Sequence, residues 1–193
     1  MRVLAIGAHP DDIEIACSGT LAKCVKRGDK VIVCHASTGN LGHVIIPPDE
    51  LTEIRKKEAE KAGSLAGIEV IGGMFNDLDI FDNNKAARDK MVEVIKYAQP
   101  DFIITHNPDD YMPDHTAVSR LVFDASFTAT LPNYHVGGEK AAKLVPIYYM
   151  DTLAGVNFNP TEFVDISDEI DLKIKMLECH ESQLVWMKEH DGI

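Results

Sequence analysis

The sequence is short of positive charge and has no long apolar run. Its 193 residues include 19 Lys and Arg against 31 Asp and Glu, which gives a net charge of −12. Without a basic stripe, the chain lacks the electrostatic footprint of a nucleic-acid-binding protein, and the same charge disfavours binding to an anionic membrane surface. No apolar run approaches the roughly 20 residues of a membrane-spanning helix. We therefore expect a soluble globular protein with neither a nucleic-acid partner nor a membrane span.

The chain also lacks the cysteine spacing of a disulfide framework or a structural metal site. Its four cysteines form no CxxC pair and follow no regular spacing. We expect them to be buried free thiols in a reducing compartment. We also expect no secretory signal, because the apolar run at residues 3–6 is short and an acidic pair, Asp11 and Asp12, follows at once. These features favour a cytoplasmic protein.

Short apolar runs of strand length alternate with longer amphipathic stretches. Runs with little period-two alternation, which is typical of strands buried on both faces, occur at residues 3–6, 31–34, 69–71, 102–105 and 146–150. Apolar residues at helical spacing predict helices around residues 13–25, 54–65, 91–98, 118–125 and 170–177. The alternation predicts a single α/β domain over residues 1–193, with a mostly parallel sheet and helices on both faces.

Polar residues rich in His, Asp and Asn follow three of the predicted strands. They occupy residues 8–12, residues 35–40, and residues 106–110 with 112–115. Ligands of open parallel sheets bind beyond the carboxyl ends of the strands. We expect these three loops to converge at one edge of the sheet.

The loop after the first strand has the composition of a catalytic zinc site. Three protein ligands with one position open to water make such a site, and His and Asp are both suitable ligands. His9, Asp12 and a later histidine fill that count, which leaves Asp11 to take the proton of the metal-activated water. The alternative is that Asp11 and Asp12 only cap the helix that begins there. A nucleotide-binding loop is disfavoured, because two carboxylates would repel a phosphate.

Two histidines compete for the place of the distant ligand. His115 is the better candidate, because it lies at the start of the helix that follows the fourth strand. His106 stands at the end of that strand, and we assign it, with Asp114, to orienting the ligands. We interpret Asp109, Asp110 and Asp114 as acids at the start of a helix. The alternative is that they bind a second metal ion in a dinuclear site.

Several motifs resemble those of the PIG-L/LmbE-like family of zinc-dependent de-N-acetylases. Residues 8–12 with residues 18–22 resemble the first family motif, and residues 101–108 leading to 113–118 resemble the second. Residues 179–183 are similar to a C-terminal family pattern, so the resemblance runs from residue 1 to about residue 187. It implies a Rossmann-like three-layer α/β/α fold, a symmetric homo-oligomer, and an enzyme that deacetylates an N-acetylated amino sugar such as an N-acetylglucosamine conjugate.

The resemblance also implies roles for individual residues. One zinc ion per chain, or another divalent ion, would be bound by His9, Asp12 and His115, with Asp11 as general base and then general acid. Arg55 matches a family arginine that contacts substrate, although a solvated helix residue is the alternative. Asp77 resembles a family acid near the sugar hydroxyls.

The sequence departs from the family pattern in its second motif. It reads Met-Pro-Asp-His at residues 112–115, where many members read His-Pro-Asp-His. Methionine cannot donate a hydrogen bond, and losing one oxyanion donor typically costs about 10² to 10³ in rate. Three interpretations follow. Another donor, such as His180, Tyr111 or a residue of a neighbouring subunit, replaces the histidine; the substrate differs; or the protein binds metal with weak or altered activity because of Met112.

Overall fold

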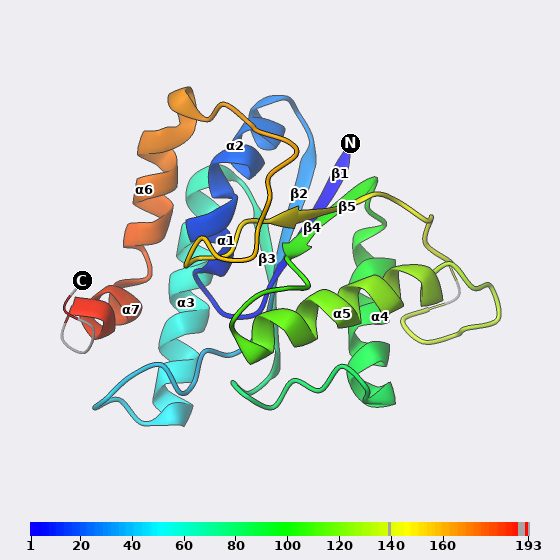
Figure 1. The fold of residues 1–193 in the computed structure, drawn as a ribbon, viewed down its shortest axis with the longest axis horizontal. Helices are drawn as coiled ribbons and strands as arrows, with labels where there is room; N and C mark the ends of the chain where they lie inside the picture. Colours follow the sequence, from blue (N-terminus) through cyan, green and yellow to red (C-terminus); the bar gives the residue numbers. More distant parts are fainter. Residues whose placement is uncertain (139, 189–191, 193) are drawn as a thin grey trace.

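A computed structural model describes residues 1–138, 140–188 and 192, and its centre is a five-stranded parallel sheet in the order β3-β2-β1-β4-β5 (Figure 1). The strands are β1 (Arg2–Gly7), β2 (Lys30–Ser37), β3 (Glu69–Phe75), β4 (Phe102–His106) and β5 (Ile147–Met150). The helices are α1 (Asp12–Ala16), α2 (Ser18–Lys26), α3 (Pro48–Ala66), α4 (Lys85–Ala98), α5 (Pro113–Thr128), the 3-10 turn η1 (Ser167–Glu169), α6 (Ile170–Glu178) and α7 (Glu181–Trp186). No helix in this part of the chain is long and apolar enough to cross a membrane.

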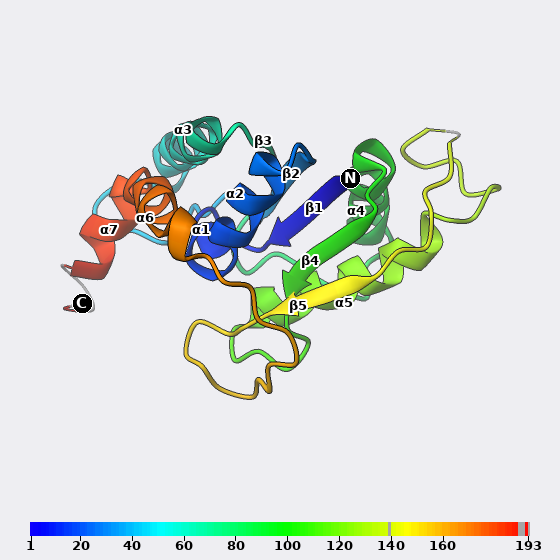
Figure 2. The same cartoon turned by 90° about the horizontal axis from the view of Figure 1, so that it is seen from above.

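Helices cover both faces of the sheet, as Figure 2 shows. Alternate residues of β1 enter two separate apolar cores, because successive side chains of a strand point to opposite faces. Val3 and Ala5 pack with residues of α1, α2, α3 and α6, whereas Leu4 and Ile6 pack with residues of α4 and α5. The predicted α/β fold with a parallel sheet is thus confirmed.

The helix predicted over residues 13–25 is wrong in one respect, because it is broken into α1 and α2. Cys17 leaves the helical conformation, with φ −140° and ψ 5°. The next residue, Ser18, donates its hydroxyl to the Glu14 carbonyl at 2.8 Å, a side-chain bond that competes with the helical pattern. Apolar spacing alone continues across this position, so it could not reveal the break.

The strand order reverses at β1, which has β2 on one side and β4 on the other. In open parallel sheets this reversal opens a crevice beyond the carboxyl ends of the two central strands. Five loops leave the parallel sheet at this edge. One follows β5, at residues 151–166, and the other four are residues 8–11 after β1, 38–47 after β2, 76–84 after β3 and 107–112 after β4. We call the latter the four edge loops. Each histidine and aspartate that the sequence assigns to the metal site lies in one of these loops or within three residues of its ends.

Candidate metal centre

The turn after β1 holds two acids on a strained backbone. Asp11 has φ 117°, a left-handed conformation that costs a non-glycine residue about 1–3 kcal/mol. Asp12 opens α1 and accepts a hydrogen bond from the His9 backbone N–H at 2.7 Å. Ser37 of β2 fastens the other side of the turn, because its N–H donates to the Ala8 carbonyl at 2.7 Å and its hydroxyl oxygen lies 2.9 Å from the same carbonyl oxygen. The surrounding bonds hold the strained turn in one conformation.

His9, Asp12 and His115 come together at this turn, as the sequence predicted for a three-ligand site. Each offers one ligand atom, and these atoms all lie within 4.8 Å of one another. His115 Nε2 is 3.3 Å from Asp12 Oδ1, and His9 Nδ1 is 3.5 Å from Asp12 Oδ2. His115 is fully buried, and its Nε2 has no hydrogen-bond partner among the described residues. A buried imidazole nitrogen facing a carboxylate fits a divalent cation.

Two further carboxylates hold the far nitrogens of the two rings. Asp114 Oδ2 lies 3.2 Å from His9 Nε2, and Asp110 Oδ2 lies 3.0 Å from His115 Nδ1. With protons on these far nitrogens, each ring turns an unprotonated nitrogen toward Asp12, which is the arrangement that metal-binding histidines commonly have. The sequence assigned an orienting role to Asp114 but interpreted Asp110 as a helix-start acid, with a ligand of a dinuclear site as the alternative. Its place five residues before His115, directly ahead of α5, was the available signal.

His106 lies against the same cluster but has a different use. Its Nε2 accepts the Ala8 backbone N–H at 2.9 Å and lies 3.2 Å from Asp12 Oδ2. Its ring stacks on that of His115 with 3.8 Å between centroids. Burial holds the pKa of His106 below its ordinary value, so the neutral ring accepts at Nε2. His106, Asp110 and His115 also form a possible ligand group. Because His106 Nε2 already accepts from Ala8 and Asp110 Oδ2 already bonds His115 Nδ1, we favour the group of His9, Asp12 and His115.

The charges around the cluster favour a cation. Burial opposes a charge on His9, but hydrogen bonds to Asp114 and Asp12 outweigh it and raise the pKa of His9 to about 10. Burial likewise opposes ionisation of Asp12, yet the surrounding histidines hold its pKa well below the usual value. Without a metal, protons on the histidines balance the carboxylates. A divalent cation would supply the same positive charge.

Asp11 lies beside these residues and is braced by Arg55 of α3. Arg55 is only 3% exposed, and its Nη2 lies 3.3 Å from Asp11 Oδ2. The same guanidinium donates to the Gly39 carbonyl at 3.1 Å and to the Pro10 carbonyl. Burial raises the pKa of Asp11 to about 6, although Arg55 opposes that rise. Arg55 is therefore no solvated helix residue, and it ties α3 to the turn after β1.

Asp77 joins the loop after β3 to the loop after β2. Its Oδ1 accepts from the Ser37 hydroxyl at 2.8 Å and from the Gly39 N–H at 2.9 Å. Its Oδ2 accepts from the Leu41 N–H at 2.9 Å. Both carboxylate oxygens of Asp77 thus organise the loops at the edge of the site.

The position of the missing histidine can be compared with the two candidate replacements from the chain itself, Tyr111 and His180. Met112 is half-buried and precedes the first residue of α5. Tyr111, next to it, is 49% exposed, and burial together with nearby carboxylates raises the pKa of its phenol, which stays a hydrogen-bond donor. His180 is fully buried, with its Nε2 3.5 Å from Oε2 of Glu14 in α1. Tyr111 is the more accessible of the two donors within the chain.

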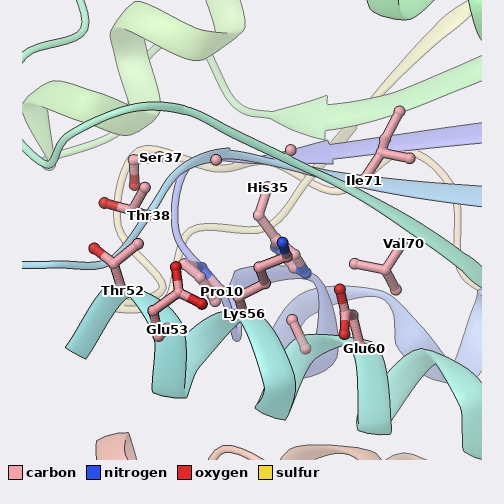
Figure 3. A pocket seen from close by; sticks show the side chains of 13 residues that line it. Pro10, His35, Ser37, Thr38, Thr52, Glu53, Lys56, Glu60, Val70 and Ile71 are labelled. Carbon is pink, nitrogen blue, oxygen red and sulfur yellow. The ribbon is translucent and has the colours of Figure 1, made fainter. Parts of the chain in front are cut away.

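A separate cavity of about 270 Å³ lies behind the turn, between α3 and the strands β2 and β3 (Figure 3). Pro10 and His35 form part of its wall, and Lys56 reaches into it from α3 (Figure 3). The far side of the His35 ring is tied to the turn, because its Nδ1 lies 3.0 Å from the His9 carbonyl oxygen. The three candidate metal ligands do not line this cavity, so it is distinct from the candidate centre.

Comparisons with known proteins agree with the fold and the motifs. A family model described as PIG-L, GlcNAc-PI de-N-acetylase, matches residues 4–126. The chain is 29% identical over 200 residues to the diacetylchitobiose deacetylase of Thermococcus kodakarensis, covering 96% of this chain and 72% of that protein. It is 26% identical over 189 residues to the 4-oxalmesaconate hydratase of Pseudomonas putida, covering 93% and 73%. The N,N'-diacetylchitobiose deacetylase structure of Pyrococcus horikoshii superposes with a TM-score of 0.82 at 26% identity, over 98% of this chain and 74% of that one.

Proposed function

The chain belongs to the PIG-L family, and on that premise we propose that it is a metal-dependent hydrolase that removes the acetyl group from an N-acetylated amino sugar. The observation that carries the proposal is the buried His115 Nε2, which lies 3.3 Å from Asp12 Oδ1 and makes no hydrogen bond within the described part of the chain, with Asp11 on the same turn. Two relatives named as deacetylases of an acetylated disaccharide support the amide chemistry.

His9, Asp12 and His115 would hold one zinc ion. Their nitrogen and oxygen donors suit zinc, and other divalent ions bind such a set as well. When bound, the ion lowers the pKa of its water to about 7 and polarises the acetyl carbonyl. Asp114 and Asp110 keep the two histidine rings turned toward Asp12, so the chain presents its donors already oriented.

Asp11 would act first as general base and then as general acid. Arg55 engages Asp11 Oδ2, which leaves Oδ1 to accept the proton of the attacking water. The same oxygen returns the proton to the amine that leaves when the amide bond breaks. Burial and the strained turn keep this carboxyl in place while it moves the proton.

Arg55 and Asp77 would shape the substrate site indirectly, by fixing the loops that surround it. Arg55 keeps Asp11 in position, and Asp77 fixes the loop after β2 beside the loop after β3. Their charged atoms already bind the chain. We therefore propose an indirect role in shaping the site in place of a charged contact with a phosphate or carboxylate.

Met112 gives the alternative, a family member that binds metal but has weak or altered activity. Its thioether cannot donate a hydrogen bond to the oxyanion of a tetrahedral intermediate. We propose that the Tyr111 phenol takes that part, since it lies next to Met112 and stays protonated at neutral pH.

A hydratase among the relatives gives a second candidate function, in which water adds to a carbon–carbon double bond of an anionic acid. Met112 favours it to some extent, because this reaction needs no donor for the oxyanion of an amide. The four edge loops argue against it, because they contain no Lys or Arg to bind the acid groups.

The test is acetate release from N-acetylglucosamine conjugates by the zinc-loaded chain, beside a hydration assay on an unsaturated dicarboxylic acid. We expect acetate release that Asp11→Asn lowers by about 10² to 10⁴ while zinc stays bound, because the proton-transfer group is lost and the three candidate zinc ligands are unchanged. Asp109→Asn is the matched control, since Asp109 is an exposed acid of an edge loop. Hydration without acetate release would replace the proposal by the second candidate.

A further inference from the structure

The four edge loops contain several acids and no Lys or Arg. The acids of residues 8–11, 38–47, 76–84 and 107–112 are Asp11, Asp77, Asp79, Asp82, Asp109 and Asp110. Acids gathered at one edge of the sheet repel anions. Apart from the candidate metal and the histidines beside it, an anionic group on the substrate would find no cation within these loops.

Two arginines on the helices that flank these loops are already paired with acids. Arg55 is buried and held by Asp11 and two backbone carbonyls. Arg120 of α5 pairs with Asp82 at 3.1 Å. Lys56, one residue further along α3, lines the separate cavity behind the turn, which the candidate ligands do not line (Figure 3). Both arginines thus already face a carboxylate.

The same loops expose a set of large apolar side chains. They are Leu41, Val44, Ile45, Leu78, Phe81 and Tyr111, each between 49% and 79% exposed. Single exposed apolar residues are common, but several of them on loops that are bonded to one another are typical of a binding surface. Here they belong to three of the loops that border the candidate metal centre.

Leu78 connects this apolar set to the candidate metal centre through Asp114. Its backbone N–H donates to Asp114 Oδ2 at 2.8 Å, the same oxygen that lies 3.2 Å from His9 Nε2. Leu78 has φ 61°, which is uncommon for a bulky residue, and its side chain is 66% exposed. Such strain persists where the surroundings impose it, often at ligand sites. Asp114 thus contacts both the exposed Leu78 and His9, a candidate metal ligand.

We infer that the group joined to the amino sugar in the substrate is uncharged and apolar, such as an alkyl or aryl aglycone. The inference rests on the proposed function and specifies its substrate class. The apolar side chains of the edge loops contact the aglycone, and their acids exclude substrates with a phosphate or carboxylate in its place.

The test compares three matched substrates of the zinc-loaded chain: the methyl glycoside, the hexyl glycoside and the 1-phosphate of N-acetylglucosamine. Acetate release should give a kcat/KM at least about tenfold higher for the hexyl than for the methyl glycoside, mainly through KM, because added methylenes are buried. The 1-phosphate should be about tenfold worse than the methyl glycoside, and the deficit should shrink as salt screens the acids. Equal rates for the two glycosides, or a preference for the phosphate, would overturn the inference.

Substitution of the apolar side chains locates the effect. Leu78→Ser with Ile45→Ser should bring the ratio of hexyl to methyl kcat/KM to within about twofold of one, because the buried methylenes lose their contacts. Phe127→Ser is the matched control, since Phe127 is 59% exposed on α5 outside the edge loops, and it should keep the full ratio. A ratio that survives in the double variant, or falls equally in the control, contradicts the inference.

Calorimetric binding separates this inference from the proposed function. If the chain releases no acetate from any of the three compounds, the proposed function fails. The inference then stands or falls on affinity alone: a hexyl glycoside bound at least about tenfold more tightly than the methyl glycoside supports it, and equal affinities refute it.

Discussion

The turn after β1 and the loop after β4 both contribute to the candidate centre, but they are built in opposite ways. The first is buried and strained, and Ser37, His35 and Arg55 fasten it from three sides. The second is largely exposed, and one acid, Asp110, closes it by accepting from the Met112 N–H at 3.0 Å and from His115. The tightly held turn, with the first residue of α1, provides two candidate ligands and the candidate base, whereas the open loop leads into α5, which provides the third candidate ligand. The backbone is held most firmly around Asp11, the residue that we propose transfers the proton.

The largest expected effect comes from loosening the tightly held turn. Arg55→Met removes the cation beside the buried Asp11 carboxylate, and breaking such a buried pair costs about 3–5 kcal/mol of unfolding free energy. Urea unfolding measures this loss. Lys57→Met, an exposed position on the same helix, should change the free energy by less than about 0.5 kcal/mol. Similar losses in both variants would show that the turn does not depend on Arg55.

A gain of activity tests the open loop. Met112→His should raise kcat for acetate release, by up to about 10²-fold, if the oxyanion lacks a good donor in the parent chain. The open loop should accept this change with little loss of stability, because Met112 is only half-buried. A large fall in the unfolding free energy would mean that the two loops are equally constrained. If Tyr111 already supplies the donor, kcat stays near the parent value and Tyr111→Phe lowers it.

A smaller effect is expected from the acid that closes the open loop. Asp110→Asn should weaken zinc binding about 10- to 100-fold, because the amide cannot fix the His115 ring as a carboxylate does. Competition with a chromophoric chelator measures the affinity. Asp109→Asn, the exposed neighbour, should leave the affinity unchanged within about twofold. Equal affinity in both variants would remove Asp110 from the site.

The two loops also differ in how much of their part in the candidate site could be predicted from the sequence. His9, Asp12 and His115 could be predicted to converge because parallel strands end at one edge, and apolar runs locate those ends. The part of Asp110 could not, since it depends on the turn that bends this acid back toward His115. The resemblance singled out Arg55, but its burial against Asp11 could not be predicted, because a helix rich in Lys and Glu does not show which of its charges is buried. The break at Cys17 likewise depends on one side-chain hydrogen bond that apolar spacing cannot reveal.

The central claim is that His9, Asp12 and His115 hold one divalent metal, and metal content per chain tests it most directly. Elemental analysis of chain purified without added metal, and again after zinc is supplied, should give about one zinc per chain in the parent and in Asp11→Asn. His115→Ala should lose the metal. A parent chain that holds no zinc even after supply, or a His115→Ala variant that keeps it, would contradict the account.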